Sequence, residues 1–226
     1  MDCQMSHKQQ SYAISLALNE LEKFAVEVDS LMELVQTKFA TIFSDSKAYK
    51  LGDIVFETAV TDSGWFYEWK GFSAPVMTKK SSVNAKGHLS FQFSFTGAST
   101  QNQLNPDFPN GMPLVHVSFF GRAINDDNIH MFFPIDISTE GINCRLELDQ
   151  NNSLIRWSYV NEFYWSYSVP LLSINASNID TLLIEPASTL LHASTEEVVL
   201  SEAFNQTVIR YPNLESISLT PETSSN

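Results

Sequence analysis

The stretch YAISLALNELEKFAVEVDSLMELVQTKFATIF, residues 12–43, decides the fold of this chain. Its apolar residues recur at alternating steps of four and three, which is the pattern of one continuous helical face. They are Ile14, Leu18, Leu21, Ala25, Val28, Met32, Val35, Phe39 and Ile42. A second row at Ala17, Phe24 and Leu31 widens this face beyond the narrow seam of a two-stranded coiled coil. We therefore predict one long amphipathic helix.

The helix can pack on either of two partners: a sheet of the same chain or the same helix of a second copy. A rod of about 32 residues is roughly 48 Å long, which is close to the width of a globule of this chain length. We therefore expect the helix to lie across the domain without protruding and to pack on a sheet of the same chain. One flank carries Ser15, Glu22 and Asp29, whereas the other is mostly apolar, so complementary coiled-coil charges are missing. The alternative is a homodimer formed through this helix.

The residues that follow are typical of short antiparallel strands separated by turns. Alternation is clearest at 88–96, where Leu89, Phe91 and Phe93 alternate with polar residues, so we expect one buried and one wet face. The other expected strands are 51–60 with its hairpin partner 65–72, then 114–120, 129–137, 142–148, 154–160, 163–172 and 181–184. Residues 73–87 and 97–113 are expected to be loops. From these nine segments we predict an antiparallel sheet of about seven strands.

A second helix is predicted to begin at Ser194, because Glu197 completes a capping box and Pro212 prevents extension. The chain thus divides into an N-terminal helix (1–50), an antiparallel β domain (51–192), a C-terminal helix packing on the same domain (193–212) and a disordered tail (213–226). This order of elements is an α+β fold.

Charge is unevenly distributed along the 226 residues. The net charge is −13, and all nine lysines lie at or before Lys86, while fifteen acidic residues and only four arginines follow. Such a surface disfavours direct binding to nucleic acid or an anionic membrane and suits a basic protein partner. The alternative is that the charge only maintains solubility.

No apolar run approaches the length of a membrane span, and residues 1–10 lack the apolar segment of a secretory signal. Two cysteines, Cys3 and Cys144, do not make a disulfide framework. We therefore expect a cytoplasmic location and no membrane association.

Motifs for phosphate binding, dinucleotide binding, a serine nucleophile elbow and zinc proteases are all missing from the sequence, so we expect no cofactor. His116 and His130 are expected on opposite faces of a hairpin, which argues against a shared metal or acid–base pair. Asp136, Glu147 and Asp149 could meet as a metal cluster, but the lysine that such nucleases use is missing. These residues favour a non-enzymatic role.

Two aromatic rows are the most distinctive local feature. Strand alternation places each row on one face, where it could bind a ligand or a protein partner. The candidate binding residues are Trp65, Tyr67 and Trp69 in the first row and Phe163, Trp165 and Tyr167 in the second. The alternative is that both rows are core packed against the long helix.

The sequence favours a non-enzymatic interaction protein, such as an adaptor, accessory subunit or inhibitor, that uses an acidic and aromatic surface. A sharper variant is a mimic of nucleic acid that occupies a basic groove. Two other classes remain: a small-ligand module with an aromatic-lined cavity between helix and sheet, and a metal-dependent hydrolase built from scattered residues.

Overall fold

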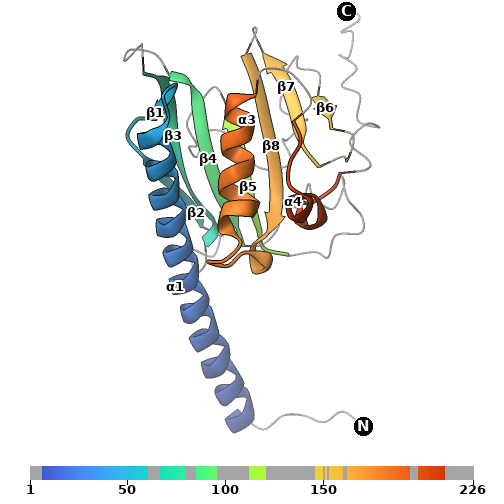
Figure 1. The fold of residues 1–226 in the computed structure, drawn as a ribbon. Coiled ribbons are helices and arrows are strands. Elements are labelled where there is room, and N and C mark those ends of the chain that lie inside the picture. The colour runs from blue at the N-terminus through green and yellow to red at the C-terminus, as the bar shows by residue number, and fades with distance from the viewer. Residues whose placement is uncertain are drawn as a thin grey trace, which may run out of the picture.

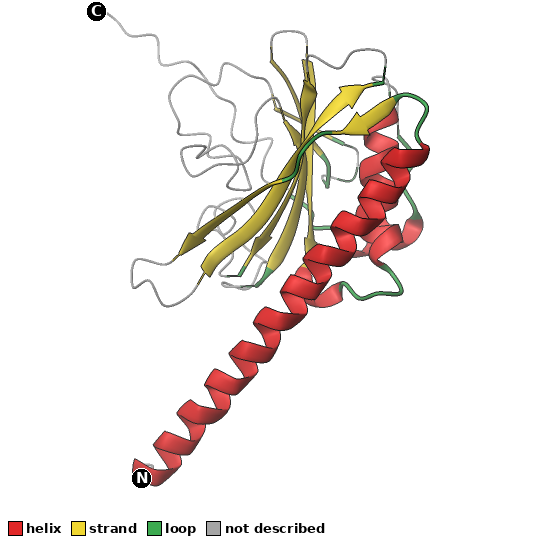
Figure 2. Cartoon of the chain, turned by 90° about the vertical axis from the view of Figure 1, so that its left-hand side faces the viewer, coloured by secondary structure: helices red, strands yellow, loops and turns green. Residues whose placement is uncertain are grey.

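An antiparallel sheet with helices on one face makes up this α+β protein, as the periodicity predicts (Figures 1 and 2). The computed structural model describes residues 7–60, 67–79, 85–95, 112–120, 146–149, 151, 153–159, 162–193 and 198–211. The expected strand 129–137 and the expected tail 213–226 lie outside these residues.

The sheet has eight described strands, all paired antiparallel, in the order β1-β3-β4-β5-β8-β7-β6, with β2 beside β3. Their bounds are β1 (Tyr49–Leu51), β2 (Val55–Val60), β3 (Tyr67–Thr78), β4 (Ala85–Ser94), β5 (Leu114–Phe120), β6 (Leu146–Leu148), β7 (Ile155–Tyr159) and β8 (Glu162–Pro170). The hairpin predicted from 51–60 and 65–72 is confirmed by the pairing of β2 with β3.

The helices are α1 (His7–Asp45), the 3-10 turn η2 (Leu171–Ser173), the π-helix η3 (Asp180–Ile184), α3 (Glu185–His192) and α4 (Glu202–Thr207). Figure 2 shows them on one side of the sheet. The core lies between these helices and the sheet, where the Phe39 ring of α1 packs on Phe91 of β4 at 4.8 Å and Phe91 stacks on Phe72 of β3 at 5.0 Å.

Helix α1 protrudes from the domain, so the expectation that it lies within the width of the globule is wrong (Figures 1 and 2). The helix runs over 39 residues rather than about 32, which makes it roughly 58 Å long. The added length is not the main reason, because the exposed part, Ser11 to Glu27, lies almost entirely within the predicted span 12–43. The sheet covers only the C-terminal part of this rod.

Residues 73–87 are mostly strand rather than the expected loop, because β3 continues to Thr78 and β4 begins at Ala85. The polar composition of this segment, with Lys79, Lys80 and Lys86, suggested a loop. Pro75 has no N–H for a strand ladder. It is tolerated within β3 because the outer neighbour of this strand changes there: β2 pairs up to Ser73, and β1 pairs from Val76 onward.

Two expectations near the C-terminus are also corrected. Residues 181–184 form a π-helix that leads into α3, and the buried Leu182, Leu183 and Ala187 show helical rather than strand spacing. Helix α4 begins after Ser201, whose hydroxyl accepts a hydrogen bond from the Phe204 N–H at 3.2 Å. Residues 198–200 are not helical, so the expected start at Ser194 is wrong; residues 194–197 themselves lie outside the described part.

Candidate interaction surface on the N-terminal half of helix α1

The apolar face of α1 enters two different environments along its length. From Val28 to Phe43 the face is core, and its residues Val28, Met32, Val35, Phe39 and Phe43 are all buried. From Ser11 to Glu27 every described residue is exposed except the half-buried Phe24. The periodicity of the sequence does not change at this boundary, so the same helical face is exposed in its N-terminal part and core in its C-terminal part.

Three contacts fix the point at which α1 leaves the sheet. The Phe24 ring meets Phe95 edge-on at 5.7 Å, and Lys70 Nζ on β3 lies 2.9 Å from the Asp29 carboxylate. About two and a half turns farther along, Lys38 Nζ lies 2.6 Å from Asp180 Oδ2 at the start of η3. These contacts hold α1 on both sides of Met32. Its N-terminal half therefore extends away from the sheet as a continuation of the same ordered helix.

The exposed part of the apolar face is called the apolar stripe and consists of Ile14, Ala17, Leu18, Leu21 and Ala25. Ile14 is 62%, Leu18 56% and Leu21 43% exposed. Single exposed apolar residues are normal, but a continuous row of them marks an interaction surface. The stripe is therefore the strongest candidate site among the described residues.

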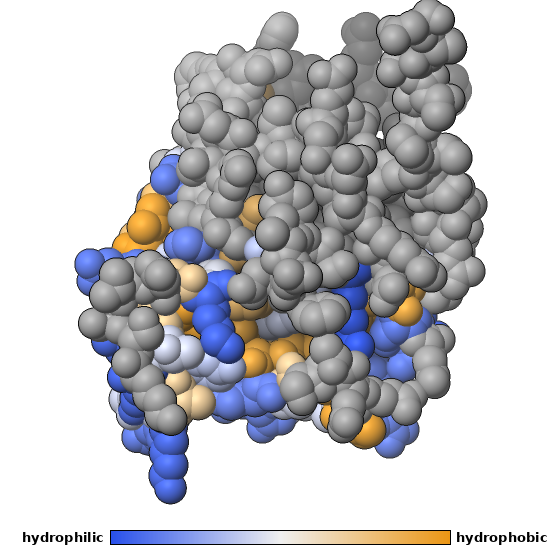
Figure 3. Space-filling view, turned by 90° about the horizontal axis from the view of Figure 1, so that it is seen from above, coloured by the Kyte–Doolittle hydropathy of each residue, from blue (hydrophilic) through white to orange (hydrophobic). Residues whose placement is uncertain are grey.

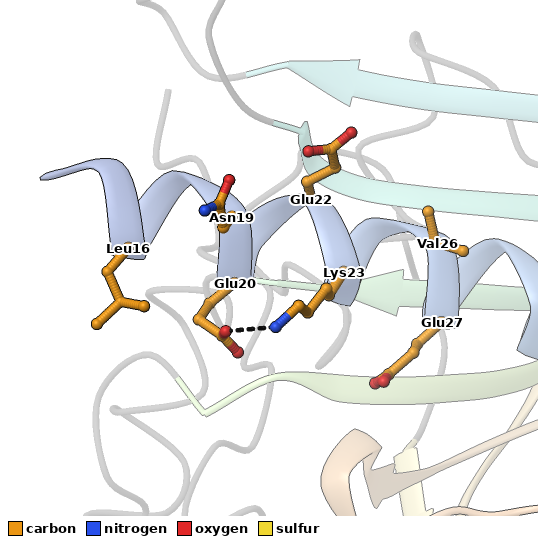
Figure 4. Close-up of a pocket in the computed structure, with 7 residues that line it drawn as sticks. All are labelled: Leu16, Asn19, Glu20, Glu22, Lys23, Val26 and Glu27. Atoms are coloured by element: carbon orange, nitrogen blue, oxygen red, sulfur yellow. Dashed lines mark hydrogen bonds and ion pairs between the residues drawn. The ribbon is translucent and has the colours of Figure 1, made fainter.

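A hollow of about 510 Å³ lies on this half of α1 (Figure 4). Its described lining residues all belong to α1 and are Leu16, Asn19, Glu20, Glu22, Lys23, Val26 and Glu27. In Figure 4, Glu20 and Lys23 form an ion pair, 2.8 Å apart, and both side chains are mostly exposed. A small-molecule site encloses most of its ligand, which residues of one exposed helix do not do. Because Leu16, Lys23 and Glu27 lie on the opposite side of α1 from Leu18 and Leu21, the hollow is separate from the apolar stripe.

Among the predicted aromatic binding residues, those whose side chains are described are buried. Trp69 is 4%, Trp165 5% and Tyr167 0% exposed. Trp65 lies outside the described residues, and for Tyr67 and Phe163 only the backbone, in β3 and β8, is described. Burial favours the alternative interpretation, in which the rows are core.

The register also separates the two rows. Trp165 pairs with Phe119 and lies on the helix side of the sheet, where it stacks on Tyr167 at 5.9 Å. The Tyr167 hydroxyl donates to the Leu183 carbonyl at 2.9 Å. Trp69 pairs with Ser94 and lies on the opposite face. The structure therefore does not bring these residues together as one site.

That opposite face is polar and nevertheless buried, whereas alternation in 88–96 predicts a wet face. Ser90 is 1% and Gln92 4% exposed, and among the described residues neither Ser90 Oγ nor Gln92 Oε1 has a hydrogen-bond partner. Beside Gln92 lies His116, whose Nδ1 is 2.7 Å from Ser168 Oγ. We call Ser90, Gln92, His116 and Ser168 the polar layer.

The contact between His116 and Ser168 has the spacing of a base and a nucleophile. Burial lowers the pKa of His116 from 6.5 to about 3, so its imidazole is neutral and a weak base. Both residues are almost completely inaccessible. The geometry therefore suits an internal hydrogen bond rather than attack on an external substrate.

The remaining candidates for chemistry are dispersed or outside the described part. Asp149 accepts backbone hydrogen bonds from Ser153 at 2.6 Å and Leu154 at 2.8 Å, which stabilise the turn before β7. His130, Asp136 and Cys144 are not among the described residues. Within the part of the chain that is described, no group of three or more His, Cys, Asp or Glu residues could hold a metal ion.

Hydrophobic and hydrophilic residues are interspersed on the described part of the face seen in Figure 3. Of the described helices, none combines the length and hydrophobicity that crossing a membrane requires. In comparisons with family models, curated proteins and solved structures, nothing matches this chain.

The sequence identified the apolar residues of this surface but not their exposure. The stripe has two alanines and no aromatic residue, whereas the buried continuation has Phe39 and Phe43. This contrast in side-chain size is the one signal that distinguishes the two halves. It is a weak signal, because alanine also occurs frequently in cores.

Proposed function

We propose that this chain is a non-enzymatic protein-interaction module whose binding element is the projecting N-terminal half of α1. The observation that carries the proposal is the exposure of Ile14, Leu18 and Leu21 on the same helical face that is core from Val28 onward. An amphipathic helix that presents such a face binds by placing it in an apolar groove or against another helix.

The held position of the helix supports this proposal. An isolated helix of about 16 residues is only marginally stable in water, and a partner would have to compensate for its ordering. Here Val35, Phe39 and Phe43 anchor the same rod in the core, so its projecting half is already ordered. A preorganised surface binds with less loss of conformational entropy.

The experiment is photo-cross-linking in the protein's own cell extract, with a photoreactive amino acid at Leu18 or Leu21. Matched controls carry it at Leu16, on the far side of α1, and at Phe56 of β2, an apolar side chain that is 58% exposed. We expect discrete protein adducts from positions 18 and 21 and few from the controls. Equal labelling at all four positions would contradict the proposal.

The acidic charge of the chain favours a second class of partner, which would bind the acidic surface rather than the apolar stripe. With a net charge of −13, a protein with a basic surface is favoured over nucleic acid or an anionic membrane. The most specific form of a basic-partner proposal is an inhibitor that mimics nucleic acid. The proposed location is the reducing cytoplasm, which is consistent with a chain that has only two cysteines. The complex should weaken steeply between about 50 and 500 mM salt; a salt-insensitive complex would exclude a charge-driven partner.

The small-ligand alternative has no comparable support. The interface between α1 and the sheet is filled by contacts among Phe39, Phe72 and Phe91. A ligand there would have to displace core residues.

A further inference from the structure

We infer that the partner of the apolar stripe is a second copy of this chain, bound with the two α1 helices antiparallel. This inference rests on the proposed function, because it identifies the occupant of the same surface. It follows from the spacing of the stripe and from the distribution of charge around it.

Four of the five residues of the stripe have the same spacing in both directions, and Ala17 lies beside this row. Ile14, Leu18, Leu21 and Ala25 are separated by steps of four, three and four residues. A twofold axis midway between residues 19 and 20 therefore places Leu18 beside Leu21 of the second copy and Ile14 beside Ala25 of the second copy. Ile14 then faces the small Ala25, which allows the helices to approach closely, while the two leucines pack against each other at the centre. Such a self-complementary patch is what a twofold dimer interface requires.

Charge selects the antiparallel orientation. Residues 9–19 contain no charged side chain, whereas 20–29 contain Glu20, Glu22, Glu27 and Asp29 and only Lys23 as a base. Parallel helices would place these acidic segments side by side, and like charges at such positions repel. In the antiparallel arrangement each acidic segment lies beside the uncharged segment of the other copy. It also lies near the positive, N-terminal end of the other helix.

The amount of exposed apolar surface fits a reversible dimer. The stripe covers about three helical turns, which alone is short for a stable coiled coil. The preordered helix reduces the cost of association, so we expect a dissociation constant of roughly 10 µM. Because each copy has a net charge of −13, salt should strengthen the dimer by screening repulsion. A complex with a basic partner would respond to salt in the opposite direction.

The test is sedimentation of the full chain between about 1 and 200 µM. The mass should rise from 25.4 kDa toward twice that value. Leu18→Glu should shift the association to at least tenfold higher concentration, because it buries charges at the centre of the interface. Leu16→Glu is the matched control and should leave it unchanged, since residue 16 lies about 160° around the helix from residue 18. Circular dichroism establishes that both variants fold.

Orientation is measured with a spin label at Ala13→Cys in a chain lacking Cys3 and Cys144. The antiparallel arrangement places the two labelled positions about 20 Å apart along the helix axes, whereas parallel helices bring them level, about 10 Å apart. A parallel distance, or a mass of one chain at every concentration, overturns the inference. A one-chain mass together with cross-links from Leu18 to another protein leaves the proposed function standing, and a one-chain mass without such cross-links removes both.

Discussion

His116 lies on β5, in the interior of the sheet, with Gln92 and Ser168 as its neighbours in register. Alternation in the sequence identifies a strand here but not what covers its polar face. That face is buried, and the pKa of His116 falls to about 3 because desolvation penalises the imidazolium. Sequence reasoning therefore places the residue correctly in a strand and misses its environment, since burial depends on contacts between distant segments.

The lowered pKa of His116 predicts that stability depends on pH. In the unfolded chain the imidazole protonates near pH 6.5, whereas in the folded chain it stays neutral until about pH 3. Between these values the unfolded state binds the extra proton, so the free energy of unfolding should fall by about 1.4 kcal/mol per pH unit as the pH decreases. Urea unfolding at pH 7, 6, 5 and 4 measures this slope. His116→Gln should reduce it, whereas His192→Gln, at an exposed position, should not; equal slopes in both variants would refute the assignment.

Gly87 on β4 is a second residue with a specific structural role, because it leaves room for the neighbouring strand β5. A Cβ at this position would lie 2.6 Å from Phe119 Cζ and 2.9 Å from the Phe120 carbonyl oxygen. Gly87→Ala should therefore lower the free energy of unfolding by about 1–3 kcal/mol through overpacking. Ala85→Ser, at an exposed position of the same strand, is the control and should change it by less than about 0.5 kcal/mol. Chemical denaturation of the two variants measures the change. An unchanged midpoint for Gly87→Ala would mean that β4 and β5 move apart at this position without loss of stability.

At the scale of elements, periodicity predicts existence and type better than boundaries. The span 114–120 matches β5, and α1 follows from its four–three steps. The C-terminal helices are predicted less well: 181–184 is a short apolar run, and such a run fits a strand or a buried helix equally. The helical spacing becomes evident only with the later residues of α3 that are buried, Pro186, Ala187 and Leu190.

The cap of α4 gives a prediction at this scale. Ser201 Oγ accepts a hydrogen bond from the Phe204 N–H, and Phe204 is fully buried against Tyr167. Ser201→Ala should lower the free energy of unfolding by about 1 kcal/mol, while Ser201→Asp should retain most of it. Ser194→Ala should have little effect, because residues 198–200 separate it from the helix. If Ser194→Ala were the more damaging substitution, the helix would begin earlier than the structure shows.

At the scale of the whole molecule, the sheet and α1 have different lengths, and the functional proposal follows from that difference. The α+β class is predictable because local patterns specify which segments are helix and which are strand. The candidate site is predictable only in part. The residues of the stripe are evident in the sequence, but their exposure depends on where the sheet ends, and strand order is not encoded in any single segment. The aromatic rows illustrate the converse, since Trp165 and Tyr167 form part of the core.

The most direct test of the central claim compares one apolar residue from each half of α1. The free energy of unfolding is measured for Phe39→Ala and Leu18→Ala at a chain concentration below that of association. Phe39 is 1% exposed, so its truncation should cost about 3–5 kcal/mol, whereas Leu18→Ala should change stability by less than about 0.5 kcal/mol. A cost of 2 kcal/mol or more for Leu18→Ala would show that the stripe is core of its own chain, and would contradict its role as a surface for another.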